Sequence, residues 1–197
     1  MESSKPGKLF LHKCYLAGPI DRAEDAGSEW RNQITPFLAK MGVLVMDPLN
    51  KPCDHGLEKD DDRARRQILQ REGDFDNLAR TMKPVRHVDM RMVDKADFLI
   101  VNFDMDIMMC GTMREIFLAV DQCKPILIHC PQGKAKIAQW MFAECPHQLF
   151  FDDWNMLRSY LTALNASDPS AYLDKKWVFF DFLDQTIAAL NAFSLTV

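Results

Sequence analysis

Two carboxylates in contrasting predicted surroundings are the first candidates for chemistry. Asp89 falls on the apolar stripe of a predicted helix, one turn from Val85 and Val93. A carboxylate there must be paired or functional, because burying an unpaired charge is costly. Partial burial raises the pKa of a carboxyl group, which suits a proton donor. Glu115 lies in the first turn of another predicted helix, where the helix dipole favours an ionised carboxylate that can act as a nucleophile or stabilise an oxocarbenium ion.

Glu115 also has a purely structural interpretation. Thr112 and Glu115 form a Thr-x-x-Glu capping box after Gly111, and that pattern alone favours a helix cap over a catalyst. Asp21 is followed by Glu24 three residues later, so Asp21 is predicted to cap the next helix. Capping and catalysis are therefore both open for these side chains.

Further candidates lie in loops that follow predicted strands. Tyr15 is near the end of the first strand and is either a core aromatic or a functional hydroxyl. Gly18 would let the backbone approach a ligand closely. Asp104 and Asp106 are either solvated loop acids or hydrogen-bonding partners of a ligand's base or hydroxyls. The first loop has neither the G-x-G-x-x-G nor the Walker A pattern, so a standard dinucleotide or P-loop site is not supported.

Hydrophobic periodicity places these residues on alternating strands and helices. Strands are predicted at 9–17, 43–46, 97–103, 125–129 and 148–151, and helices at 21–41, 85–96, 112–122, 153–165 and near 169–193. This order predicts an α/β fold, a doubly wound parallel sheet of about five strands with helices on both faces. Ligands bind beyond the carboxyl ends of such strands, which directs attention to the loops 18–22, 104–112 and 130–136.

Composition sets the broad class of the protein. The 197 residues, 48% hydrophobic and 26% charged, predict a single α/β domain over 1–197, with a charged insertion at about 50–83 and a helical C-terminal extension from about 153. A net charge of −4 disfavours nucleic-acid binding. No apolar run is long enough for a membrane helix, and a polar start argues against a signal peptide, so we expect a cytoplasmic protein. The six cysteines lack C-x-x-C spacing; we expect reduced thiols, no metal and no cofactor.

Four segments in this order carry a family resemblance: Tyr15-Leu-Ala-Gly-Pro-Ile-Asp21, Asp89-x7-Asp97-Phe-Leu-Ile-Val, Gly111-Thr-x-x-Glu115 and Lys124-Pro-Ile-Leu127. Over about residues 8–127, the chain resembles the nucleoside 2-deoxyribosyltransferase-like superfamily. That group includes nucleoside deoxyribosyltransferases and 2′-deoxynucleoside 5′-phosphate N-hydrolases. The resemblance implies a flavodoxin-like fold. It also implies cleavage of an N-glycosidic bond through a glycosyl-enzyme intermediate that water or a second base resolves.

The resemblance also implies roles for individual residues. Glu115 is similar to the family's nucleophile, Tyr15 to the hydroxyl that orients it, and Asp89 to the acid that assists departure of the base. The expected substrate-binding residues come from the first loop, the loop after the third strand and the start of the next helix: Gly18, Asp21, Arg22, Asp104, Asp106, Gly111 and Thr112.

Two departures and two alternatives accompany this interpretation. Where the nucleotide-hydrolase branch places phosphate-binding serines, this chain has Pro19 and Met108-Met109-Cys110. Phosphate recognition would therefore fall to Arg22, Lys134 or Lys136.

The alternatives are a glycohydrolase of NAD or a related nucleotide and a non-catalytic nucleotide-binding module. Family members often assemble, and the aromatic-rich segment 175–183 predicts an interface of a homo-oligomer.

Overall fold

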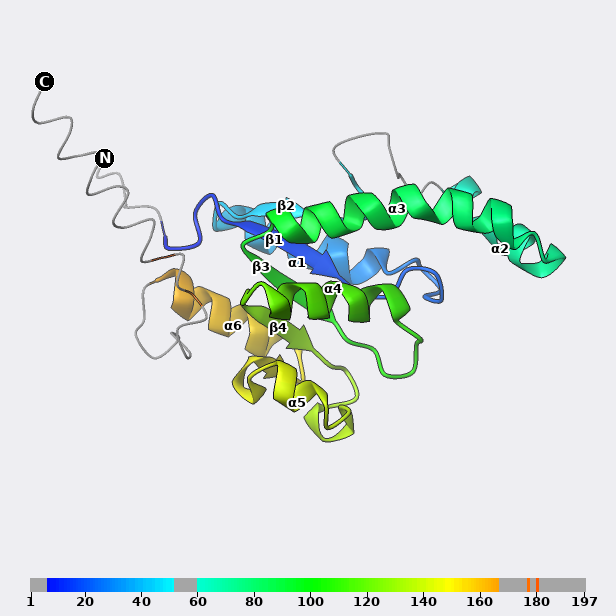
Figure 1. Ribbon diagram of the computed structural model, residues 1–197. Coiled ribbons are helices and arrows are strands. Elements are labelled where there is room, and N and C mark those ends of the chain that lie inside the picture. Colours follow the sequence, from blue (N-terminus) through cyan, green and yellow to red (C-terminus); the bar gives the residue numbers. More distant parts are fainter. Residues whose placement is uncertain (1–6, 52–59, 167–176, 178–179, 181–197) are drawn as a thin grey trace, which may run out of the picture.

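Five parallel strands form one sheet in the computed structural model, which describes residues 7–51 and 60–166 together with Trp177 and Phe180 (Figure 1). In the described part of the chain the strands are β1 (Lys13–Ala17), β2 (Leu44–Met46), β3 (Phe98–Asn102), β4 (Ile126–His129) and β5 (Phe150–Phe151). They lie in the order β2-β1-β3-β4-β5, and every neighbouring pair is parallel. This is the flavodoxin-like order of a doubly wound sheet, so the predicted fold class is confirmed.

Helices cover both faces of the sheet. On one face lie α1 (Ser28–Lys40) and α6 (Trp154–Asn165), and on the other lie α3 (Phe75–Lys95), α4 (Cys110–Asp121) and the short α5 (Met141–Glu144). Because successive strand residues face opposite sides, Tyr15 of β1 packs toward α3 and α4, whereas Cys14 and Leu16 pack toward α1 and α6. Two 3₁₀ turns, η1 (Lys134–Lys136) and η2 (His147–Leu149), lie between β4 and β5.

The strand order places the loops after β1 and β3 at a switch point. β2 and β3 pair with opposite edges of β1, so the chain leaves the carboxyl ends of β1 and β3 toward different faces of the sheet. Ligands of doubly wound sheets bind at this kind of divergence. The sheet thus brings the first loop and the loop 103–109 to one edge.

Both capping predictions are wrong. Helix α1 begins at Ser28, seven residues after Asp21, and the carboxylate of Asp25 accepts from the N–H groups of Gly27 and Glu29 at 2.8 and 2.7 Å. Asp21 is exposed in the preceding turn. Helix α4 begins at Cys110, its N-cap residue makes no side-chain cap bond, and Glu115 falls in the second turn. The dipole argument for Glu115 fails as well, because that effect fades beyond the first turn.

The charged insertion contains a helical hairpin. Helix α2 (Asp60–Glu72) turns at Gly73 into α3, which begins ten residues earlier than predicted and passes through Pro84. The side chain of Asp74 accepts from the N–H of Asn77 at 3.2 Å and starts α3. The hairpin extends beyond the sheet, while the last turns of α3 pack on it (Figure 1).

The two described aromatic residues of the segment 175–183 do not form an exposed patch of the kind expected there. Trp177 and Phe180 are 3% and 1% exposed and belong to the core layer of α1 and α6. The Trp177 ring lies 5.4 Å from Phe98 of β3. These two rings therefore pack inside the subunit, and the rest of the predicted C-terminal helix lies outside the described residues.

None of the helices that the structure describes is long and apolar enough to cross a membrane.

Candidate functional site

The centre of the candidate site is a buried hydrogen bond between β1 and α4. The hydroxyl of Tyr15, which is 0% exposed, donates to Oε1 of Glu115 at 2.8 Å, and Glu115 is 8% exposed. Burial and the charges of Glu115 and Asp89 raise the pKa of Tyr15 well above its usual value. The phenol therefore stays protonated and donates, which fixes one carboxylate oxygen of Glu115.

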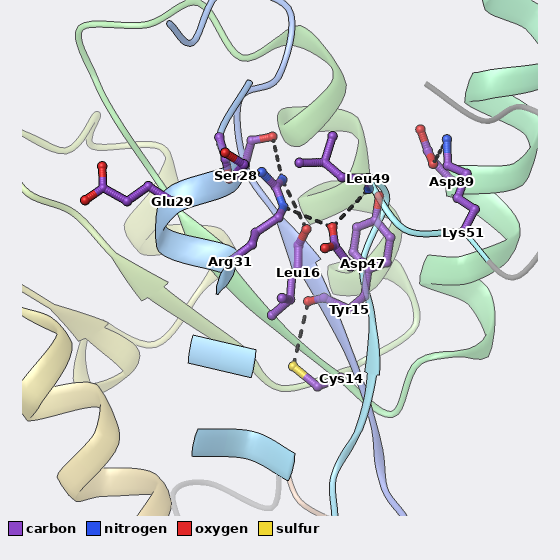
Figure 2. A network of polar contacts seen from close by, with 12 residues as sticks. Cys14, Tyr15, Leu16, Ser28, Glu29, Arg31, Asp47, Leu49, Lys51 and Asp89 are labelled. Carbon is purple, nitrogen blue, oxygen red and sulfur yellow. Dashed lines mark hydrogen bonds and ion pairs between the residues drawn. The ribbon is translucent and has the colours of Figure 1, made fainter. Parts of the chain in front are cut away.

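Asp89 reaches the same layer from α3. It is buried with Val85, Met92 and Val93 on the inner stripe of that helix, where the sequence placed it. Its Oδ1 lies 2.8 Å from Nζ of Lys51, and Figure 2 shows the two side chains facing each other. Burial raises the pKa of Asp89 above its usual value, although the charges of Lys51 and Arg31 act in the opposite direction. For Asp89, the effect of burial is therefore larger than that of the two cations.

Arg31 of α1 is a buried cation behind the first loop. Its guanidinium is 1% exposed and donates to the carbonyls of Gly27, Leu16 and Gly18 at 2.7, 3.3 and 3.2 Å. Its Nε lies 3.5 Å from Oδ1 of Asp47, which follows β2. In Figure 2, dashed lines join the guanidinium to Leu16 and to Asp47. Arg31 therefore ties the carboxyl ends of β1 and β2 to α1.

Together these groups form a buried charge cluster. Arg31 interacts electrostatically with Tyr15, Glu115 and Asp89, and Lys51 interacts with Asp89, so each carboxyl group has a cation acting on it. Glu115 is oriented by a neutral hydroxyl, whereas Asp89 faces an ammonium. Two carboxyl groups in such different surroundings suit one nucleophile and one acid.

Three members of this cluster were not predicted: Arg31, Asp47 and Lys51. Arg31 lies on the same helical stripe as the buried Ile34 and Leu38, so the argument that singled out Asp89 would also have found it. Asp47 and Lys51 follow β2, whose carboxyl end faces the same edge as that of β1. The edge rule, applied to the second strand as well, would have included them.

The loop after β3 is joined to the loop after β4 by Gln132. The Gln132 amide nitrogen donates to Oδ1 of Asp104 at 2.6 Å and to Oδ2 of Asp106 at 3.0 Å. Its Oε1 accepts from the N–H of Met105 at 3.2 Å. Sequence reasoning had placed both aspartates at a ligand edge and had missed the glutamine. The two acids hold one loop conformation and retain further acceptor capacity.

Gly18 is buried by aromatic packing. A Cβ atom at this position would lie 2.9 Å from Cζ2 of Trp30. Trp30 stacks on Trp154 at 5.4 Å between ring centroids, and Trp154 stacks on His129 at 4.1 Å. Trp30 therefore leaves no room for a side chain at position 18, which fixes the path of the first loop.

The remaining predicted binding residues are spread along the same edge. Asp21, Arg22 and Gly111 are exposed and Thr112 is buried. Lys134 donates its backbone N–H to Asp152, and Lys136 is exposed.

The described residues offer no evident metal site. Within 7–51 and 60–166, no three His, Cys, Asp or Glu side chains gather closely enough to hold an ion. The cysteines described there are free thiols: Cys14, Cys110, Cys123, Cys130 and Cys145.

Comparison with known proteins gives one extended match. The family model for nucleoside 2-deoxyribosyltransferase matches residues 14–145, more than half of the chain. No curated protein matches the sequence significantly. Among solved structures, the chain is similar to the 2-deoxyribosyltransferase of the psychrotolerant bacterium Bacillus psychrosaccharolyticus, with 19% identity over 75% of this chain and 91% of that one and a TM-score of 0.46. It is also similar to a 2-desoxiribosyltransferase from Leishmania mexicana, with 16% identity over 76% of this chain and 96% of that one and a TM-score of 0.46.

Proposed function

Because the chain belongs to the nucleoside 2-deoxyribosyltransferase family, we propose that it cleaves the N-glycosidic bond of a nucleoside or nucleotide through a glycosyl-enzyme intermediate. The observation that carries this proposal is the buried 2.8 Å hydrogen bond from Tyr15 to Glu115. Asp89, a carboxyl group with a raised pKa, lies in the same layer. A nucleophile fixed by a hydrogen bond and a second carboxyl group with a raised pKa suit displacement at an anomeric carbon.

In the first half of the proposed reaction, Glu115 attacks the anomeric carbon. A carbon–oxygen bond forms while the carbon–nitrogen bond breaks, and the bonding pair leaves with the base. Asp89 donates its proton to the departing base, which neutralises the charge that develops there. Tyr15 keeps its proton throughout and holds the Glu115 oxygen that does not attack.

In the second half, water or a second base attacks the same carbon and expels Glu115. Asp89, now ionised, accepts the proton of the attacking group. Hydrolysis and transfer use the same residues, so they differ in which nucleophile reaches the site. We propose a small-molecule substrate and include both outcomes.

The proposed binding residues lie in the loops after β1 and β3 and at the start of α4: Gly18, Asp21, Arg22, Asp104, Asp106, Gly111 and Thr112. The aspartates fixed by Gln132 are the proposed acceptors for sugar hydroxyls or base N–H groups. For a 5′-phosphate, Arg22, Lys134 and Lys136 are the proposed cations.

A base-release screen tests the proposal. The purified chain is incubated with nucleosides and nucleoside monophosphates, with and without an acceptor base, and the free base is measured by chromatography. Glu115→Gln should lower turnover by several orders of magnitude and keep the fold, because its amide oxygen still accepts from Tyr15. The matched control is Glu144→Gln on α5, where the carboxylate accepts from Trp140 at 2.7 Å; its activity should match that of the parent chain.

Three outcomes would contradict the proposal. Full turnover by Glu115→Gln would show that Glu115 is not the nucleophile. Base release from NAD alone would favour the glycohydrolase alternative. Binding of nucleosides without turnover of any substrate would favour the non-catalytic module.

We also propose a homo-oligomer, although Trp177 and Phe180 do not supply its interface. Light scattering at micromolar concentration measures the molar mass, and a stable, active monomer would refute the assembly.

A further inference from the structure

Lys51 carries a buried ammonium that has no role in the reaction steps proposed above. It follows β2, and its side chain is 0% exposed. Nζ lies 2.8 Å from Oδ1 of Asp89. The ion pair joins the segment after β2 to α3 (Figure 2). Burying a cation is unfavourable unless it is paired, so a functional role would explain why the ammonium is buried at this position.

The two oxygens of Asp89 are in different surroundings. Oδ1 is shielded from solvent and forms an ion pair with Lys51 that lacks hydrogen-bond geometry. The side chain as a whole is 11% exposed, so that exposed area lies elsewhere than on Oδ1. An ammonium group has three donors and no acceptor. A proton on Oδ1 would therefore point at another donor, and the stable position for the proton of Asp89 is Oδ2.

We propose that Lys51 is a positioning residue for the proposed reaction: by holding Oδ1, it places the acidic proton of Asp89 on Oδ2, the oxygen left for the departing base. This inference rests on the proposed function and deepens it. Lys51 donates no proton to the substrate; it sets the orientation and the proton affinity of the acid that does.

The charged groups that act on Asp89 are Lys51, which follows β2, and Arg31 of α1, and Asp89 in turn acts on Tyr15 of β1, which donates to Glu115 of α4. Among the described residues, Lys51 is the one in direct polar contact with Asp89. Its positive charge stabilises the ionised carboxylate, in opposition to burial. Removing that charge should therefore keep Asp89 protonated to higher pH.

The test measures base release against pH for Lys51→Met, Lys51→Arg and a matched lysine. The control is Lys124→Met, because the Lys124 ammonium also contacts α3, donating to the carbonyls of Val93 and Asp94 at 2.6 and 2.7 Å. In Lys51→Met, kcat should fall roughly 10–100-fold, part of the 10²–10⁴ that a general acid contributes. The alkaline limb of the kcat/KM profile should move to higher pH. Lys51→Arg should keep the limb close to that of the parent chain.

The control separates positioning from structural support. Lys124→Met should lower the melting temperature and leave the alkaline limb in place. If Lys51→Met gives that same pattern, Lys51 only supports the fold and the inference is wrong.

A double variant keeps the test decisive if Lys51→Met does not fold. Lys51→Met with Asp89→Asn removes both charges, which avoids leaving one buried ion unpaired. Its rate should equal that of Asp89→Asn alone, because Lys51 acts through Asp89. A further loss of rate in the double variant would overturn the inference. If the parent chain releases no base from any substrate, the proposed function fails instead, so the two failures are distinguishable.

Discussion

Replacing Tyr15 by phenylalanine removes one atom from the centre of the site. The lost hydroxyl donates to Glu115 at 2.8 Å between side chains that are 0% and 8% exposed. A buried hydrogen bond to a charged group contributes about 1.5–3 kcal/mol. Tyr15→Phe should therefore reduce the free energy of unfolding by about that amount, or lower the melting temperature by roughly 3–12 °C for a chain of this size.

The same bond has a separate effect on the reaction. If the hydroxyl fixes the attacking carboxylate, its contribution of about 1.5–3 kcal/mol converts to a fall in kcat of roughly 10–150-fold. KM should change little, because the hydroxyl orients the nucleophile and does not hold the base. Steady-state base release at saturating substrate gives kcat, and thermal denaturation followed by circular dichroism gives the melting temperature.

The matched control is Tyr160→Phe on the opposite face of the sheet. The oxygen of Tyr160 accepts from Nε1 of Trp177 at 2.9 Å, and burial raises the pKa of Tyr160 to about 12. Losing this neutral bond should cost about 1 kcal/mol of stability and leave kcat unchanged. If Tyr15→Phe behaves in the same way, its hydroxyl is a structural group and the reasoning about Glu115 is refuted.

Three other variants test the cluster and the fold. Asp89→Asn should remove the alkaline limb of kcat/KM and slow cleavage by roughly 10²–10⁴-fold, most for poor leaving bases; an unchanged limb in the pH profile would exclude Asp89 as the acid. Arg31→Met should cost roughly 3–5 kcal/mol in urea unfolding, since it leaves Asp47 without its cation; a loss below 1 kcal/mol would contradict the buried network. Burial alone would raise the pKa of Asp97, but His12 and the N–H of Lys13 lower it below its usual value. A lowered pKa stabilises the fold above the unfolded value near 4 and loses that contribution as pH falls through the folded value. Asp97→Asn should therefore cost about 1 kcal/mol at pH 7 and progressively less below pH 4, and a cost independent of pH would refute the ionic origin.

The sequence by itself determined the class of fold and one inward-facing acid. Strand positions and the alternation of strands with helices follow from local hydrophobic periodicity. This periodicity is a property of the sequence and does not depend on tertiary contacts. The same periodicity identified Asp89, because one charged residue interrupts the apolar stripe of its helix. The order of strands and helices along the chain, together with the rule for parallel crossovers, placed the candidate loops at one edge of the sheet.

Helix starts were determined less well, because local capping signals compete. Asp21 and Asp25 both precede α1, and the bonds of Asp25 to Gly27 and Glu29 decide where the helix begins. The capping-box pattern at Thr112 was overridden in the same way, since α4 starts at Cys110. A pattern of four residues does not specify which of two nearby turns closes the first helical hydrogen bond.

The family resemblance implied the Tyr15–Glu115 pair, but local sequence patterns identify none of the pairings in the site. Tyr15 and Glu115 are 100 residues apart in the chain, and Lys51 meets Asp89 from a different element. No sequence period relates such residues, because their contact depends on sheet register and on how α3 and α4 pack across it. Burial then sets the proton affinities: the interior weakens solvation, so each charge depends on the particular partner that packing brings to it.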